Sequence, residues 1–278
     1  MRFRHLDAYR VQRELQRYEG TAQRDLYREL RERFLFRHQT ATGWVLDLGS
    51  GPGRFLPFLG GDDARPVAVD LSMEMLRQIP DVWAARNPRG PVPDRVRADA
   101  RRPPFAPRRG SRVVLLGNTL GFAERDAEEV LSTAEDLVAP GGVLVVEVAP
   151  ASGERSRYLT RLPRSSVARL LRAPPAVVVP RIDREGFVTE PARRVKPGNF
   201  RRFGVPELHD RWRRRGWELL ESVAVAPALG LDRPRLEQIR SDTKSWSHLL
   251  EVEETVGRRA ERWGHAAAVL LSARRPPA

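Results

Sequence analysis

One segment constrains the fold of this chain more than any other: Val45-Leu46-Asp47-Leu48-Gly49-Ser50-Gly51-Pro52-Gly53-Arg54-Phe55. An apolar run with one acidic residue ends in three glycines at every second position, and apolar positions resume at Phe55. This pattern predicts a buried strand, a tight glycine turn and the start of a helix. Glycines permit positive φ angles and let the main chain approach a ligand closely. The segment therefore predicts a loop that holds a nucleotide-type cofactor.

The spacing within this loop narrows the choice of cofactor. Dinucleotide-binding loops have the pattern G-x-G-x-x-G, whereas here the pattern is Gly-x-Gly-x-Gly, and Asp47 lies two residues before its first glycine. A carboxylate aimed into the loop repels a pyrophosphate but suits a ligand that carries an ammonium and a sulfonium. The sequence contains no G-x-x-x-x-G-K-[ST] motif, which excludes a P-loop.

The run Asp47 to Gly53 resembles motif I of the class I S-adenosylmethionine-dependent methyltransferases. Four later segments resemble the family's following motifs in order: residues 67–76, 98–105, 113–122 and 137–148. The resemblance covers roughly residues 41–150. It implies a Rossmann-like doubly wound α/β fold, a seven-stranded mixed sheet whose last strand is antiparallel. It also implies S-adenosyl-L-methionine as the cofactor and methyl transfer as the reaction.

The resemblance also implies which residues bind the cofactor. Asp47 and the glycine-loop backbone would hold its methionine part, Asp70 its ribose hydroxyls, and Asp99 its adenine amino group. Asp99 has an alternative role as the ion-pair partner of the adjacent arginines. The complete expected set is Asp47, Gly49, Ser50, Gly51, Gly53, Asp70, Leu71, Met75, Asp99, Ala100, Asn118 and Leu120.

The candidate catalytic residues on the acceptor side are Asn118, Glu147 and Tyr18, although a structural role is favoured for Glu147 and Tyr18. The motif [DN]-P-P-[FYW] is missing, which disfavours methylation of adenine N6 or of glutamine. Residues 117–122 instead resemble the G-N-[ST] turn of small-molecule amine methyltransferases. The histidines lack metal-ligand spacing, so no metal is predicted.

Composition excludes some chemistries. The 278 residues include no cysteine, which removes disulfides, thiolate metal sites and the cysteine adduct used in cytosine-C5 methylation. No segment approaches the roughly 20 apolar residues of a membrane span, and the N-terminus lacks a signal-peptide pattern. We therefore expect a cytoplasmic protein without a membrane anchor.

Hydrophobic periodicity predicts four regions. Residues 1–40 form a helical lid of two amphipathic helices broken near Gly20, and residues 41–150 form the cofactor-binding core. Residues 151–205 form an Arg- and Pro-rich insertion, and residues 206–278 complete the sheet. Within the core, we expect strands near 44–48, 66–70, 95–98, 112–117 and 142–148, and helices near 54–59, 72–86 and 124–138.

Beyond the core, the insertion is predicted to have a helix at 164–172 and strand-like segments at 177–179, 187–189 and 200–203. The C-terminal region is then predicted to contain helices at 207–215, 235–240 and 249–263, with strands at 216–225 and 265–273.

The positive charge is concentrated in one segment. Residues 151–215 contain 17 basic and 6 acidic residues, a net charge of +11, out of +13 for the whole chain. This segment is either a face for RNA or an anionic substrate, with aromatic residues for stacking, or a solvated cap.

Taken together, the motifs of the sequence predict methyl transfer to N or O of a small molecule. The alternatives are an RNA methyltransferase and a non-catalytic regulatory protein that binds the cofactor.

Overall fold

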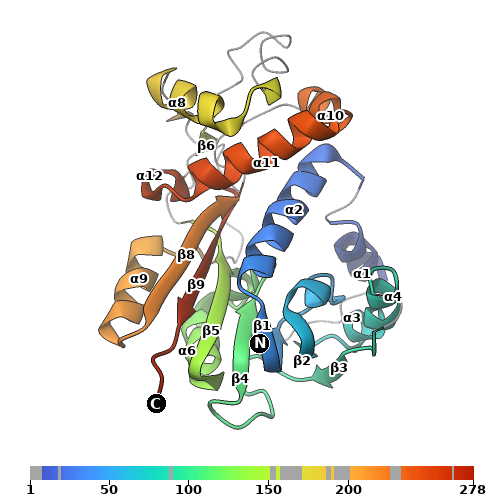
Figure 1. Ribbon diagram of the computed structural model, residues 1–278. Coiled ribbons are helices and arrows are strands. Elements are labelled where there is room, and N and C mark those ends of the chain that lie inside the picture. The colour runs from blue at the N-terminus through green and yellow to red at the C-terminus, as the bar shows by residue number, and fades with distance from the viewer. Residues whose placement is uncertain are drawn as a thin grey trace.

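The computed structural model has a central seven-stranded sheet with helices on both faces (Figure 1). The strand order is β3-β2-β1-β4-β5-β9-β8, and β9 runs antiparallel to both of its neighbours. The remaining pairs are parallel. The Rossmann-like mixed sheet with an antiparallel last strand is therefore confirmed. The structure describes residues 8–17, 20–87, 90–150, 155–156, 171–185, 189–190, 201–225, 233–264 and 266–278.

The first five strands come from one alternating stretch of the chain. They are β1 (Thr40–Leu48), β2 (Gly60–Asp70), β3 (Asp94–Arg97), β4 (Gly110–Leu115) and β5 (Val138–Val148). The helices between them are α3 (Met73–Arg77), α4 (Ile79–Ala84), α5 (Thr119–Phe122) and α6 (Ala127–Leu137). Because these strands are parallel, their carboxyl ends meet at one edge of the sheet, where ligands bind in such folds.

The two ends of the chain add helices and complete the sheet. The predicted pair of N-terminal helices is confirmed as α1 (Ala8–Leu15) and α2 (Ala22–Arg37), and the Thr21 side chain caps α2. The C-terminal elements follow the predicted order: α9 (Val205–Arg214), β8 (Glu218–Val225), α10 (Arg233–Arg240), α11 (Thr243–Gly257), α12 (Ala260–Trp263) and β9 (Ala268–Arg274).

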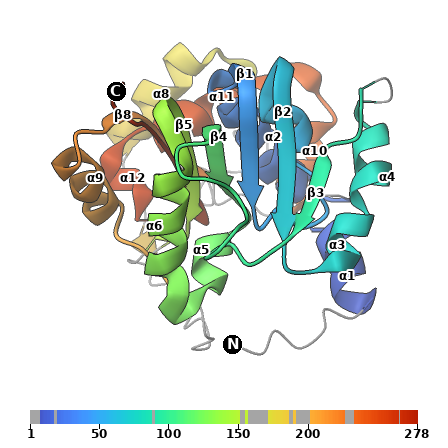
Figure 2. The same cartoon turned by 90° about the horizontal axis from the view of Figure 1, so that it is seen from below.

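Successive side chains along a strand point to opposite faces of the sheet, and this creates one apolar core on each face. Val45 and Val114 pack with α2, α10 and α11, whereas Leu46 and Leu48 pack with α5, α6 and α9. Figure 2 shows α5 and α6 in front of the sheet and α2 and α11 behind it. Since both faces are covered, the second halves of β1, β4 and β5 are buried and largely apolar, as expected of parallel strands.

The predicted helix at 54–59 is wrong. Only a single 3-10 turn, η1 (Leu56–Phe58), forms there, and β2 already begins at Gly60. Thr40 pairs with Gly60 at the start of the β1–β2 register, so sheet pairing takes up residues that would otherwise continue the helix. The glycine loop is therefore not followed by an α-helix whose N-terminus could face a ligand.

Two further predictions need correction. The helix predicted at 72–86 is divided into α3 and α4, because Pro80 in the first turn of α4 begins a new helix. The valine run 177–179 is helical and lies in α8 (Pro175–Glu185). Val178 and Val179 are buried and belong to the core that includes α11, whereas Val177 is exposed, so burial of one helix face overrides the β propensity of valine.

Little of the predicted insertion belongs to the described residues. The strands β6 (Arg155–Ser156) and β7 (Thr189–Glu190) pair antiparallel, and Phe203 forms an isolated parallel bridge with Pro150. Most of the predicted helix 164–172, and residues 187, 188 and 200 of the predicted strands, lie outside the described ranges. Within those ranges, no helix has both the length and the hydropathy needed to cross a bilayer. The division into four regions stays a prediction.

Candidate active site

The glycine loop between β1 and η1 has the open backbone that its sequence predicts. Gly49, Gly51 and Gly53 have φ angles of +77°, +55° and +75°. A Cβ at position 49 would lie 2.5 Å from Thr119 Oγ1, whereas a Cβ at position 51 would meet nothing within 4 Å. Glycine is therefore required at 49 by close packing, and at 51 it leaves space above the backbone.

Asp70 ends β2 and holds the glycine loop in place. The Gly51 N–H donates to Asp70 Oδ2 over 2.9 Å, and the Ser72 N–H donates to Oδ1 over 2.8 Å. Burial raises the pKa of Asp70, although these two N–H groups oppose the rise. Each carboxylate oxygen keeps a second lone pair, so the group can still accept hydrogen bonds from vicinal hydroxyls.

Asp47 is a buried carboxylate below the same loop. Its side chain is 3% exposed, and among the described residues its Oδ1 atom has no hydrogen-bond partner. Burial, followed by the negative charge of Asp70, raises the pKa of Asp47 to about 7, although Arg112 opposes the rise. A buried acceptor without a partner is costly, so this group suits a cationic donor.

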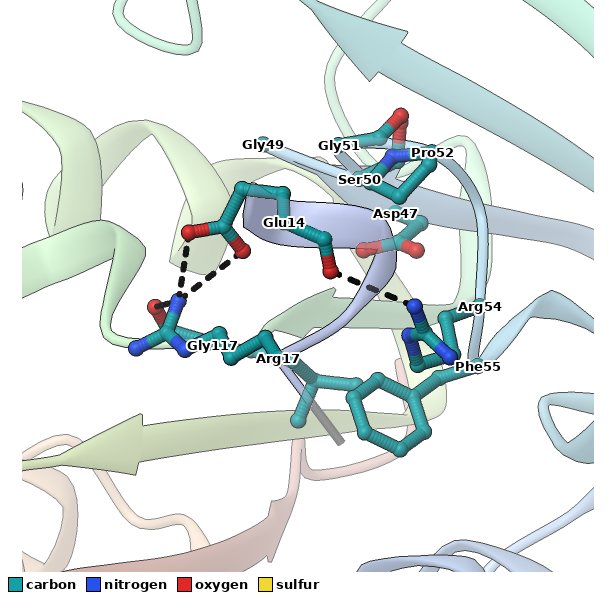
Figure 3. A pocket seen from close by; sticks show the side chains of 11 residues that line it. Glu14, Arg17, Asp47, Gly49, Ser50, Gly51, Pro52, Arg54, Phe55 and Gly117 are labelled. Carbon is teal, nitrogen blue, oxygen red and sulfur yellow. Dashed lines mark hydrogen bonds and ion pairs between the residues drawn. The ribbon is translucent and has the colours of Figure 1, made fainter. Parts of the chain in front are cut away.

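A pocket lies at the carboxyl ends of β1 and β4, in front of this carboxylate (Figure 3). It is lined by Glu14, Arg17, Asp47, Gly49, Ser50, Gly51, Pro52, Arg54, Phe55, Leu116 and Gly117. Four of the predicted residues, Asp47, Gly49, Ser50 and Gly51, are thus brought together around one cavity, whereas Gly53 is not among the lining residues. The lining also includes residues that sequence reasoning missed, above all the charged residues Glu14 in α1 and Arg17 just after it.

The charged residues on the N-terminal side of the pocket are bonded to one another and to the chain. Arg17 Nη1 lies 3.2 and 3.3 Å from the two carboxylate oxygens of Glu14, and it also contacts the Gly117 carbonyl. Arg54 donates to the carbonyls of Glu14 and Leu15. These contacts place the end of α1 across the mouth of the glycine loop (Figure 3).

Asn118 follows β4 at the edge of the same site. Its backbone is left-handed, with φ of +66°, and its Oδ1 atom has no hydrogen-bond partner within the described part of the chain. The neighbouring Gly117 N–H donates to Glu147 Oε2 over 3.2 Å. The hydrogen bond to Glu147 thus holds the turn that carries Asn118 in place. The Asn118 Oδ1 atom in this turn is a hydrogen-bond acceptor that has no partner among the described residues.

Glu147, on β5, is fully buried and paired with Arg31 of α2. Burial alone would raise the pKa of this carboxyl, but the charge and hydrogen bonds of Arg31 outweigh it and hold the pKa below its ordinary value. A carboxylate so engaged is a poor proton acceptor. The geometry therefore favours a positioning role for Glu147 over the predicted catalytic one.

Comparison with known proteins identifies the domain. Residues 45–142 match the model of a methyltransferase domain family. The part of the chain that carries the glycine loop is therefore a methyltransferase domain. No curated protein matches the sequence of this methyltransferase.

Solved structures share the fold of this methyltransferase at low sequence identity. Magnesium protoporphyrin IX methyltransferase from Synechocystis PCC 6803, with bound S-adenosylhomocysteine, is 12% identical, with a TM-score of 0.54 over 96% of this chain and 95% of that one. The [4+2]-cyclase SpnF is 15% identical, with a TM-score of 0.51 over 89% of this chain and 80% of that one. The fold therefore accommodates more than one activity, and the acceptor must be argued from the site.

The residues present fit the cofactor of the family, S-adenosylmethionine. Asp47 lines the pocket and its partnerless Oδ1 is an acceptor suited to an ammonium, and the space above Gly51 admits a ligand against the backbone. The Asp70 carboxylate retains acceptor capacity for ribose hydroxyls. Leu71, next to it, is 38% exposed and can cover an adenine ring.

The other predicted site residues do not line the pocket. Asp99 is engaged by Arg101, whose Nη2 lies 2.6 Å from Asp99 Oδ2, so the alternative ion-pair role is the one observed. Met75 and Leu120 are buried, and Ala100 packs against the apolar core. Their roles toward the cofactor stay predictions, as does that of Gly53. Tyr18 lies outside the described residues.

Of the three charged residues that sequence reasoning missed, one had a sequence signal. Arg54 directly follows the glycine motif and could have been included with it. Glu14 and Arg17 lie in a charge-rich stretch of residues 1–40, in which nothing distinguishes them from their neighbours. Their place in the site depends on how α1 packs on the sheet edge.

Proposed function

We propose that this methyltransferase transfers a methyl group directly to a nitrogen or oxygen atom of a small-molecule acceptor. One observation carries the proposal. Asn118 Oδ1, at the carboxyl end of β4, is a buried acceptor without a partner among the described residues. An N–H or O–H group of an acceptor would satisfy it, whereas a carbon nucleophile would not.

The cofactor supplies a methyl group that its sulfonium already activates. The chain must therefore orient the acceptor lone pair in line and exclude water, rather than provide a strong base. A hydrogen bond to Asn118 Oδ1 would orient the acceptor, and the left-handed turn at Asn118 would keep this oxygen in place. Glu147 is ionised and bound by both Arg31 and the Gly117 N–H, which fits a mechanism that needs no general base.

Ion pairing in the basic region supports a small acceptor over RNA. Arg201 and Arg211 bind Glu128 of α6. Arg211 and Arg215 also bind the buried Glu135. Arginines that neutralise carboxylates of their own chain contribute little to phosphate binding. These three arginines therefore join α9 and the residues beside it to α6 of the same chain.

Labelled methyl transfer to separate pools of amines, hydroxyl compounds and RNA tests the proposal. We expect transfer to a small molecule, and we expect Asn118→Ala to lower kcat at least tenfold. The matched control Asn87→Ala, in the turn after α4, should retain full activity. Equal rates for the two variants would contradict the role of Asn118.

Two outcomes would replace the proposal. Transfer to RNA, together with RNA affinity that falls with salt and is lost on neutralising Arg193, Arg194, Arg201 and Arg202, would identify an RNA methyltransferase. Tight binding of S-adenosylhomocysteine without transfer to any pool would favour a non-catalytic role.

A further inference from the structure

The pocket contains opposite charges that the loop motif does not explain. Asp47 and Glu14 are acidic, and Arg17 and Arg54 are basic. The amino-acid end of the cofactor is itself a zwitterion, with an ammonium and a carboxylate on the same carbon. Asp47 can take the ammonium, but its negative charge repels the carboxylate. A cationic side chain elsewhere in the pocket would stabilise this carboxylate.

The two arginines of the pocket differ in how they are held. Arg54 is 5% exposed and donates to two backbone carbonyls at the end of α1, so its guanidinium joins the lid to the loop. Arg17 instead binds the side-chain carboxylate of Glu14, and both partners of this pair are about one-third exposed, 30% and 36%. The Arg17 guanidinium therefore already binds a carboxylate inside the pocket, that of the Glu14 side chain.

We infer that Arg17 binds the α-carboxylate of the cofactor and that Glu14 competes with this carboxylate for the same guanidinium. A guanidinium binds a carboxylate through parallel N–H donors, and such charge-assisted bonds are among the stronger polar contacts. Arg17 Nη1 also reaches the Gly117 carbonyl, which places it across the pocket from the glycine loop (Figure 3). The assignment rests on the cofactor of the proposed function.

The competition has a consequence for the lid. Glu14 lies in α1 and Arg17 follows this helix closely. When the cofactor binds, its carboxylate would replace the Glu14 carboxylate as the partner of Arg17. The cofactor would then be bonded both to the sheet edge, through Asp47, and to the lid, through Arg17. An adenosyl ligand that lacks the carboxylate would bind the sheet edge without contacting the lid.

Calorimetry with two probes tests the inference. S-adenosylhomocysteine has both the amine and the carboxylate, and S-adenosyl-3-thiopropylamine has the amine alone. Arg17→Met should weaken binding of S-adenosylhomocysteine by about 10- to 100-fold, as loss of a charge-assisted bond implies, with less than a twofold effect on the amine. Glu14→Gln should strengthen binding of S-adenosylhomocysteine alone, and Arg17→Lys should restore part of the loss.

Arg65→Met, on the exposed part of β2, is the matched control and should change neither affinity. Equal losses for both probes in Arg17→Met would indicate a structural role, and unchanged affinities would place the carboxylate elsewhere; either result overturns the inference. If the wild-type chain binds neither probe, the cofactor assignment itself fails. Circular dichroism of each variant separates these results from misfolding.

Discussion

Arg31 of α2 and Glu147 of β5 form a buried two-point ion pair. Arg31 Nε and Nη2 donate to Oε2 and Oε1 of Glu147 over 2.9 and 2.7 Å. Because Glu147 also accepts from the Gly117 N–H, one carboxylate joins a helix of the N-terminal region to the turn before Asn118. The pair therefore couples the packing of α2 to the conformation of the turn that carries Asn118.

Removing one partner of this pair should be strongly destabilising. Glu147→Gln leaves the Arg31 cation buried without a counter-charge, and we expect a loss of about 3–5 kcal/mol in the free energy of unfolding by urea. The double variant Arg31→Met with Glu147→Leu should recover most of that loss. Glu218→Gln, which breaks the exposed pair with Arg274, is the control and should cost well under about 1 kcal/mol.

Cofactor affinity should depend on pH through Asp47. The ammonium binds the ionised carboxylate, and the pKa of Asp47 is about 7. Below that pH a proton must be displaced, so affinity for S-adenosylhomocysteine should fall by up to about tenfold per pH unit. Calorimetry between pH 5.5 and 8 would measure the slope. Asp47→Asn should bind weakly with no such slope, whereas the exposed Asp62→Asn should behave as wild type.

Asp47→Asn should also stabilise the fold, and more strongly at high pH. The pKa of Asp47 is raised from 3.8 to about 7 in the folded state, so the carboxyl group costs stability increasingly as the pH rises from the unfolded pKa to the folded one. The variant removes this cost, which has an upper limit of about 4 kcal/mol at pH 8 and less than half of that at pH 5. Thermal melts at the two pH values test the difference. An equal shift of Tm at both would contradict it.

Arg112 should support both stability and the charge of Asp47. This buried arginine of β4 donates to the carbonyls of Leu59 and Leu35 over 2.6 and 3.1 Å. Its pKa is lowered by burial to about 9, with Asp47 opposing the shift. Arg112→Met should cost about 2–3 kcal/mol in urea unfolding.

The same variant should move the pH midpoint of cofactor binding upward, because the positive charge of Arg112 lowers the pKa of Asp47. Arg109→Met removes an exposed cation above the Trp44 ring and is the control for both measurements. A stability loss without a change of the midpoint would show that Arg112 serves packing alone.

The sequence determined the sheet and the loop because both depend on local patterns. Buried parallel strands require apolar runs, and a left-handed turn with a close backbone approach requires glycine at Gly49. These requirements involve few residues that are close in the chain. The succession of strands along the chain and the position of Asp47 and Asp70 at their carboxyl ends could therefore be predicted without a structure.

Tertiary structure decided what surrounds that loop. Pairing of Thr40 with Gly60 leaves a 3-10 turn where a helix was predicted. Arg31 binds the carboxylate of Glu147, which the sequence had offered as a catalytic candidate. Glu14 and Arg17 enter the pocket only because α1 crosses the glycine loop. Such contacts join residues about 20 to 120 positions apart, and their energies depend on burial and on partner geometry, which no local pattern encodes.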